Sequence, residues 1–180
     1  MEEQEQNVAP ADGSAAATGG LYLAFMLGTE AFAIEILRVR EIVEYGEPTP
    51  VPLMPPAVCG VVNLRGAVVP VLDLAVRFGR EPAVVGRRSC FVIVEVEYRG
   101  ATHVLGLLVD RVTAVMEIAS ADIGPPPTFG TRVNVEFISG IARSNDRFLI
   151  ILNLARALSI EEMSAIARVN EERHPSLAAA

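Results

Sequence analysis

Apolar residues along this chain gather in short runs separated by turn residues, a pattern typical of β-strands. The runs at 21–27 and 31–36 flank a turn that contains Gly28, and the runs at 90–98 and 103–118 flank Arg99-Gly100. Each pair predicts a β-hairpin, and the last run is long enough to form two strands. The sequence therefore predicts an all-β protein rather than a helical one.

The stretch GVVNLRGAVVPVLDL, at 60–74, predicts another hairpin with an unusual tip. Its two apolar runs flank Asn63-Leu64-Arg65-Gly66, where Gly66 can adopt the positive φ that other residues resist. A proline-rich connection, PTPVPLMPP, precedes it and is expected to be extended. Arg65 is a permanent cation at the tip of a very apolar hairpin, and core packing does not account for it.

Comparison of the two halves of the chain shows an internal repeat. RVREIVE (38–44), which fits either a short strand or a turn of helix, aligns with RVTAVME (111–117). GVVNLRGAVVPVLDL aligns without a gap with GIARSNDRFLIILNL (140–154), so that Asp73 falls opposite Asn153 as an expected helix N-cap. Each half then has about five strand-like runs, which predicts two five-stranded barrels in one body. Runs such as FLIIL are apolar at every position, so we expect both faces to be covered.

The distribution of large apolar residues sets the expected boundaries. The first twenty residues have none apart from Met1 and Val8, which predicts a disordered tail. Ser159, followed by acidic residues, is the expected N-cap of a C-terminal helix. The predicted segments are a tail at 1–20, a folded domain at 21–158, a helix at 159–174 and a tail at 175–180. The folded domain contains the approximate repeats 21–80 and 88–158, whose strands can be exchanged between the barrels. Short helical turns are also expected before the C-terminal helix.

The net charge is −7 and the pI is about 4.9, which argues against partners with phosphate backbones and against anionic membrane surfaces. The local basic cluster of Arg77, Arg80, Arg87 and Arg88 lacks interleaved aromatic residues and is interpreted as a solvated loop. Neither a signal peptide nor a run of 18 apolar residues is present, so a cytoplasmic protein without membrane insertion is expected. Cys59 and Cys90 have no CxxC spacing and are expected to be small buried hydrophobes.

The sequence offers little for catalysis. His103 and His174 have no Ser or Cys in a familiar arrangement, and Asp73 and Asp110 are more simply structural than a pair of catalytic carboxylates. No phosphate-binding glycine motif and no metal-ligand spacing occurs, so no cofactor and no metal is expected. A small barrel hydrolase that uses Asp73, Asp110 or His103 remains the enzyme alternative.

A recognition surface is the better candidate. Arg65 and Glu41 are flanked by the apolar side chains of Val39, Ile42 and Leu64, and charged residues ringed by aliphatic ones suit a protein-binding groove. The alternative is a surface salt bridge worth about 0.2–1 kcal/mol.

Five segments carry a resemblance to a known family: AIEILRVREI, GVVNLRGAVVPVLDL, GLLVDRVTAV, the PPP segment and GIARSNDRFLIILNL. In this order, from about residue 21 to 158, the chain resembles the CheW family of chemotaxis coupling proteins. The resemblance implies two SH3-like five-stranded barrels and no catalytic activity. It also implies an adaptor that links the cytoplasmic tip of chemoreceptors (methyl-accepting chemotaxis proteins) to the regulatory domain of the histidine kinase CheA, within membrane-associated receptor arrays. A non-flagellar pathway, such as pilus-based or gliding motility, is the alternative setting.

The resemblance also carries over residue roles. It implies that receptors contact the VREI and NLRG motifs and, less sharply, the repeated RV segment. Asn153 stands where the family usually has Asp, and kinase contacts in the family have no sharp motif. The implied receptor-binding residues are Val39, Glu41, Ile42, Asn63, Leu64, Arg65 and Val112.

Overall fold

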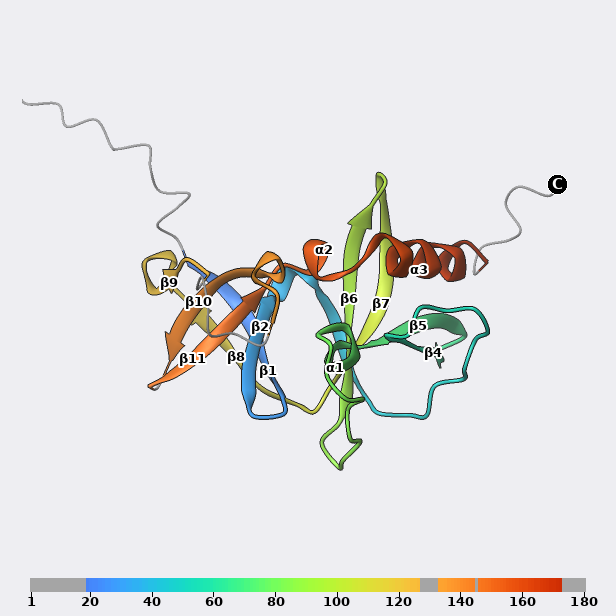
Figure 1. The fold of residues 1–180 in the computed structure, drawn as a ribbon, viewed down its shortest axis with the longest axis horizontal. Coiled ribbons are helices and arrows are strands. Elements are labelled where there is room, and N and C mark those ends of the chain that lie inside the picture. The colour runs from blue at the N-terminus through green and yellow to red at the C-terminus, as the bar shows by residue number, and fades with distance from the viewer. Residues whose placement is uncertain (1–18, 127–132, 145, 173–180) are drawn as a thin grey trace, which may run out of the picture.

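The computed structural model describes residues 19–126, 133–144 and 146–172, which form two curled β-sheets side by side with short helices between and around them (Figure 1). The first sheet contains, in spatial order, β8 (Arg111–Ile118), β1 (Gly20–Leu27), β2 (Glu30–Glu35), β11 (Arg147–Leu152), β10 (Ile138–Ser144) and β9 (Ile123–Gly124). The second contains β3 (Val39–Glu44), β6 (Cys90–Tyr98), β7 (Ala101–Val109), β5 (Ala67–Asp73) and β4 (Val58–Leu64). We call the two parts the first and second lobes. The mostly-β fold with two small lobes is confirmed, and the first sheet has one strand more than expected, the two-residue β9.

Short helices connect and cover the strands. They are α1 (Leu74–Arg77), α2 (Leu154–Ala157), α3 (Ile160–Glu172) and the 3-10 helices η2 (Ile36–Arg38), η3 (Ser120–Asp122) and η4 (Val135–Phe137). The ambiguous segment at 38–44 is a strand, β3, preceded by a helical turn. Most of the predicted N-terminal tail, the turn residue Asn145, and the chain from residue 173, including His174, lie outside the described residues.

Each sheet draws strands from both halves of the sequence. β1 and β2 join β8 to β11, while β3 to β5 join β6 and β7. In each lobe the two halves meet through one antiparallel pair of strands, β1 with β8 and β3 with β6. They also meet through one parallel pair, which places Ile150 opposite Phe32 in the first lobe and Leu72 opposite Leu107 in the second. The sequence repeats are therefore not the lobes themselves, and neither half of the chain contains a complete sheet.

Local sequence determines the hairpin tips and the helix starts. Arg65 and Gly66 both have positive φ, 53° and 85°, as type I′ turns require, so the expectation for Gly66 is confirmed and the arginine shares its conformation. The carboxylate of Asp73 accepts a hydrogen bond from the backbone N–H of Ala75, and the Asn153 side chain accepts one from the N–H of Arg156. Both predicted N-caps are thus confirmed.

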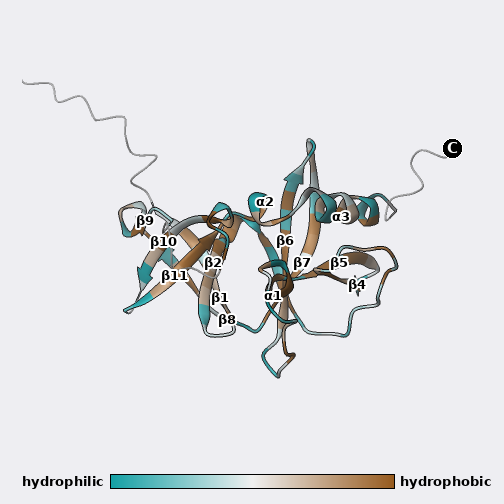
Figure 2. Ribbon diagram, viewed as in Figure 1, coloured by the Kyte–Doolittle hydropathy of each residue, from teal (hydrophilic) through white to brown (hydrophobic). Residues whose placement is uncertain are grey.

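Alternation along the strands creates three apolar clusters. A cluster around Ala33 and Ile151 lies within the first sheet, and another around Phe91 and Val71 lies within the second. The largest cluster contains residues of both sheets, such as Phe32 of β2, together with residues of the helices. It therefore fills the space between the lobes. Side chains on both faces of the central strands therefore enter apolar clusters, and Figure 2 shows apolar colouring along these strands and mixed colouring along α3. This explains why the strand runs are apolar at every position.

Two arginines of the predicted basic cluster join the lobes. The guanidinium of Arg77 donates to the carbonyl of Ala157, lies 3.2 Å from the Glu162 carboxylate and covers the Phe137 ring at 4.5 Å. Arg80 pairs with Glu30 at 2.8 Å. The interpretation of these two residues as part of a solvated loop is wrong. They are close in sequence to the exposed Arg87 and Arg88, but their own partners come from distant segments that the local sequence does not indicate.

The helix α3 begins with a capping box. The N–H of Glu162 donates to the Ser159 hydroxyl at 3.1 Å, and the N–H of Ser159 donates to the Glu162 carboxylate at 2.8 Å. Glu162 is only 4% exposed, so this carboxylate links the helix start to Arg77 at the lobe junction. The helix packs against β5 and β7 of the second lobe.

Gly60 lies where two segments approach closely. Its φ is 142°, and an added Cβ would lie 2.2 Å from the carbonyl oxygen of Thr49, which pairs with Val61 through two backbone hydrogen bonds. We expect Gly60→Ala to lower the free energy of unfolding by about 2–4 kcal/mol, because strained backbone and lost pairing add. Urea denaturation measures this. Gly46→Ala is the matched control, since its Cβ would meet nothing within 4 Å, and equal midpoints for the two variants would contradict the expectation.

Candidate recognition site

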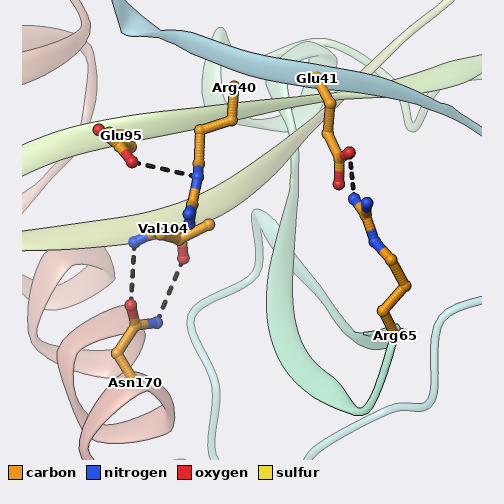
Figure 3. Close-up of polar contacts among 6 residues, drawn as sticks. All are labelled: Arg40, Glu41, Arg65, Glu95, Val104 and Asn170. Atoms are coloured by element: carbon orange, nitrogen blue, oxygen red, sulfur yellow. Dashed lines mark hydrogen bonds and ion pairs between the residues drawn. The ribbon is translucent and has the colours of Figure 1, made fainter.

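An ion pair joins the two outer strands of the second sheet. β3 and β4 lie at opposite edges of that sheet, and the guanidinium of Arg65, at the tip of the β4–β5 hairpin, donates to the carboxylate of Glu41 in β3 (Figure 3). The Glu41 side chain is 32% exposed and that of Arg65 is 77% exposed. The hydrogen bond with Glu41, followed by its negative charge, raises the pKa of Arg65 above its ordinary value. The pair therefore spans the open side of the sheet while remaining accessible.

A hollow of about 370 Å³ lies beside this pair. Apolar side chains from β5, β6 and β7 line it, and a second ion pair, Arg40 with Glu95 at 3.1 Å, lies nearby (Figure 3). The lining residues are Arg40, Glu41, Leu64, Arg65, Ala67, Val69, Ile93 and Val104. An apolar surface with charged residues around it suits an apolar side chain flanked by polar ones, as protein partners present.

A bulge in β3 separates the VREI residues. Val39 pairs with Val94, but Glu41 pairs with Ile93, so the register shifts at Arg40. Paired residues share a face of the sheet. Val39 consequently packs against the cluster between the lobes, whereas Glu41 faces the hollow.

The other candidates occupy different positions. Ile42 is 46% exposed in β3, and the Asn63 side chain accepts a hydrogen bond from the N–H of Gly66 at 2.9 Å. Val112 in β8 packs against the cluster between the lobes, and its backbone hydrogen-bonds the Cys90 thiol. The structure therefore brings Glu41, Leu64 and Arg65 together at the hollow, and it places Val39 and Val112 against the junction of the lobes.

Several lining residues escape prediction from the sequence. Ile93 and Val104 come from strands that begin more than forty residues after β3 ends, and their own runs look like ordinary strand sequence. Arg40 is part of the VREI motif in the sequence, but only the bulge in the folded strand turns its neighbour Glu41 toward the hollow. No sequence pattern distinguishes these positions, because strand exchange determines which segments become neighbours.

The residues of the enzyme alternative serve separate structural contacts. Asp73 accepts from the N–H groups of Ala75 and Ala83, and Asp110 accepts from Gly28. His103 is 7% exposed, with its Nε2 atom 3.3 Å from the carbonyl of Tyr98. Within the described part of the chain, no group of three or more His, Cys, Asp or Glu residues could hold a metal ion. These contacts describe caps and turns, not a shared reaction centre.

Cys59 is expected to be a weakly reactive thiol. Burial, followed by the negative charge of Asp73, raises its pKa from 9.0 to about 11, and the thiol donates a hydrogen bond to the carbonyl of Val71. Because the thiolate is the nucleophile, we expect alkylation by iodoacetamide at pH 8 in a Cys90→Ala background to be about 100-fold slower in the native than in the urea-unfolded protein. The native rate should rise with pH up to about 11. Equal rates in the two states would contradict this environment for Cys59.

The family model described as the CheW-like domain matches residues 21–162. The chain belongs to the CheW family. The chemotaxis protein CheW of Klebsiella aerogenes is 32% identical over 151 residues, covering 84% of this chain and 89% of its own. That of Rhizobium meliloti is 34% identical over 143 residues, covering 79% and 90%.

Two further comparisons extend this result. Protein FrzA of Myxococcus xanthus is 32% identical over 150 residues, covering 82% of this CheW-like chain and 90% of its own. The crystal structure of the scaffolding protein TtCheW from Thermoanaerobacter tengcongensis superposes with a TM-score of 0.70 at 30% identity, covering 89% and 96%. This supports the two-lobed SH3-like architecture of the CheW family. Over its described residues, the CheW-like chain contains no helix with the length and apolar character that crossing a membrane would require.

Proposed function

We propose that this chain is a non-catalytic adaptor of a chemotaxis pathway, which couples chemoreceptors to a CheA-type histidine kinase. Membership of the CheW family supports the adaptor role, as does similarity to a protein described as a scaffold. The observation that carries the proposal is the hollow beside Glu41 and Arg65, since it combines an apolar surface with an accessible ion pair and no reactive group.

The receptor side of the adaptor is proposed to be the surface formed by β3, the β4–β5 hairpin tip and β8. Glu41, Leu64 and Arg65 would contact the receptor tip directly at the hollow. The remaining residues would act beside it: Ile42 as an exposed apolar contact, Asn63 by holding the turn, and Val39 and Val112 at the lobe junction. The regulatory domain of the kinase, similar in fold, would use another surface. Binding of both partners would recruit this chain to membrane-associated receptor arrays.

Two binary binding measurements test the proposal. The purified chain should bind a soluble chemoreceptor tip fragment from its host, and separately a CheA-type kinase from the same host, each measured by calorimetry. Absence of either interaction at concentrations of about 100 μM would contradict the adaptor role, because weaker binding corresponds to less than about 5.5 kcal/mol.

A chemosensory pathway that does not control flagella, such as pilus-based or gliding motility, is the second setting that we propose to test. Deletion of the chain in its host distinguishes the two. Loss of flagellar chemotaxis with normal surface motility supports the first setting, and loss of surface motility alone supports the second.

A further inference from the structure

The strand β7 has an edge that its neighbouring strand leaves open. β5 pairs with β7 only from Gly106 to Leu108, so the earlier residue Val104 has no strand partner on that side within the described chain. Its backbone N–H and C=O point away from β6 and toward α3. Buried backbone groups without partners cost about 1–3 kcal/mol each, so something must satisfy them.

The side chain of Asn170 in α3 satisfies both groups. Its Oδ1 atom accepts from the N–H of Val104 at 2.9 Å, and its Nδ2 group donates to the carbonyl of Val104 at 3.2 Å (Figure 3). One amide thus reproduces the pair of hydrogen bonds that a neighbouring strand would supply. Nδ2 also donates to the carbonyl of Ile166 at 3.1 Å, and Ile166 is 1% exposed in the cluster between the lobes. Asn170 is therefore held from its own helix.

Val104 itself lines the hollow. The residue is 9% exposed and lies in the apolar cluster with Val69 and Ile93, at the hollow that Glu41 and Arg65 border. A continuous series of contacts consequently runs from the lobe junction through Ile166 and Asn170 to a wall of the hollow.

We propose that Asn170 is a positioning residue of the recognition site, which fixes the place of Val104 in the hollow and makes the C-terminal helix part of receptor binding. This rests on the proposed function. Asn170 lies more than one hundred residues from Arg65 in the sequence, and the implied receptor-binding motifs do not include it.

The test compares three variants for binding of a fluorescently labelled chemoreceptor tip fragment from the host. Asn170→Leu keeps the size and removes both hydrogen bonds to Val104, and Asn170→Asp keeps only the acceptor. Ser164→Ala is the matched control, because it removes a different side-chain contact between α3 and the second lobe, Ser164 with Tyr98 at 3.3 Å, without touching Val104. Denaturation curves fix a temperature at which every variant is folded, and Asn170→Asp serves alone should the leucine variant not fold.

We expect Asn170→Leu to raise the Kd about tenfold, the change that corresponds to about one net hydrogen bond, and Asn170→Asp to raise it less. Ser164→Ala should leave the Kd within about twofold. In the Arg65→Glu background, Asn170→Leu should add little, because both act through one hollow. Wild-type affinity in both Asn170 variants, an equal loss in Ser164→Ala, or full additivity with Arg65→Glu would overturn the role of Asn170. Failure of the wild-type chain to bind would instead remove the proposed function, and this inference with it.

Discussion

Arg65→Glu is expected to leave the fold intact and to lower affinity for a chemoreceptor tip by about 10–100-fold. The Arg65 side chain is 77% exposed, and an exposed pair contributes no more than about 1 kcal/mol to stability. At an interface, the same charge reversal places two carboxylates, those of residues 41 and 65, beside the hollow and repels a partner matched to the native pair. Titration of labelled receptor tip, together with thermal denaturation, measures both properties.

The second hairpin offers a matched control. Arg143 lies near the tip of the β10–β11 hairpin, the repeat counterpart of β4–β5, and its side chain is 72% exposed beside Asp146. Arg143→Glu makes the same change of charge away from the hollow and should keep receptor affinity within about twofold. Adding Glu41→Arg to Arg65→Glu restores an ion pair of reversed direction, so stability should return while binding stays weak. A fall in stability with unchanged affinity would assign Arg65 to the fold instead.

Arg77→Met should lower the free energy of unfolding by about 2–4 kcal/mol, which corresponds to roughly 10 °C in Tm for a chain of this size. The substitution leaves the Glu162 carboxylate, whose side chain is 6% exposed, without its cation, and it removes the guanidinium that covers the Phe137 ring. Differential scanning calorimetry measures the change. Because Arg77 joins α1 to α3 and η4, the loss should affect the junction of the lobes rather than one hairpin.

Arg40→Met is the control for this second prediction. Arg40 pairs with Glu95 at 3.1 Å, but the two side chains are 50% and 41% exposed, so solvent screens the interaction. We expect less than about 1 kcal/mol of destabilisation. Similar losses for Arg40→Met and Arg77→Met would contradict the importance assigned to burial at the lobe junction.

Local features of this fold were predictable because their causes lie within a few residues. The caps at Asp73 and Asn153 and the positive φ of Gly66 follow from turn and helix-start chemistry, and strand runs follow from apolar patterning. The repeat indicated two similar bodies but could not determine which strands pair, since both halves contain equally apolar runs. Strands of the two halves pair antiparallel, as β1 with β8 and β3 with β6, and parallel, as β2 with β11 and β5 with β7. No local pattern encodes these long-range pairs.

The candidate site likewise has a part that the sequence predicted and a part that it did not. The NLRG tip and VREI strand were apparent because a charged pair interrupts apolar runs, and the structure joins Arg65 to Glu41. The sequence did not indicate the hydrogen bond between Val104 and Asn170 beside the hollow, because a valine in a strand and an asparagine on a polar helix face are common in any protein. Likewise, the partners of Arg77 and Arg80 come from segments that only the folded chain brings near.

In the proposed function, one molecule of this chain holds a chemoreceptor and a kinase at the same time. Membranes that contain a host chemoreceptor should be sedimented with the CheA-type kinase, with and without the purified chain. We expect the kinase to enter the pellet only when the chain is present, and Arg65→Glu to abolish this recruitment while Arg143→Glu does not. Equal recovery of the kinase with and without the chain, or competition between receptor and kinase for it, would contradict the account.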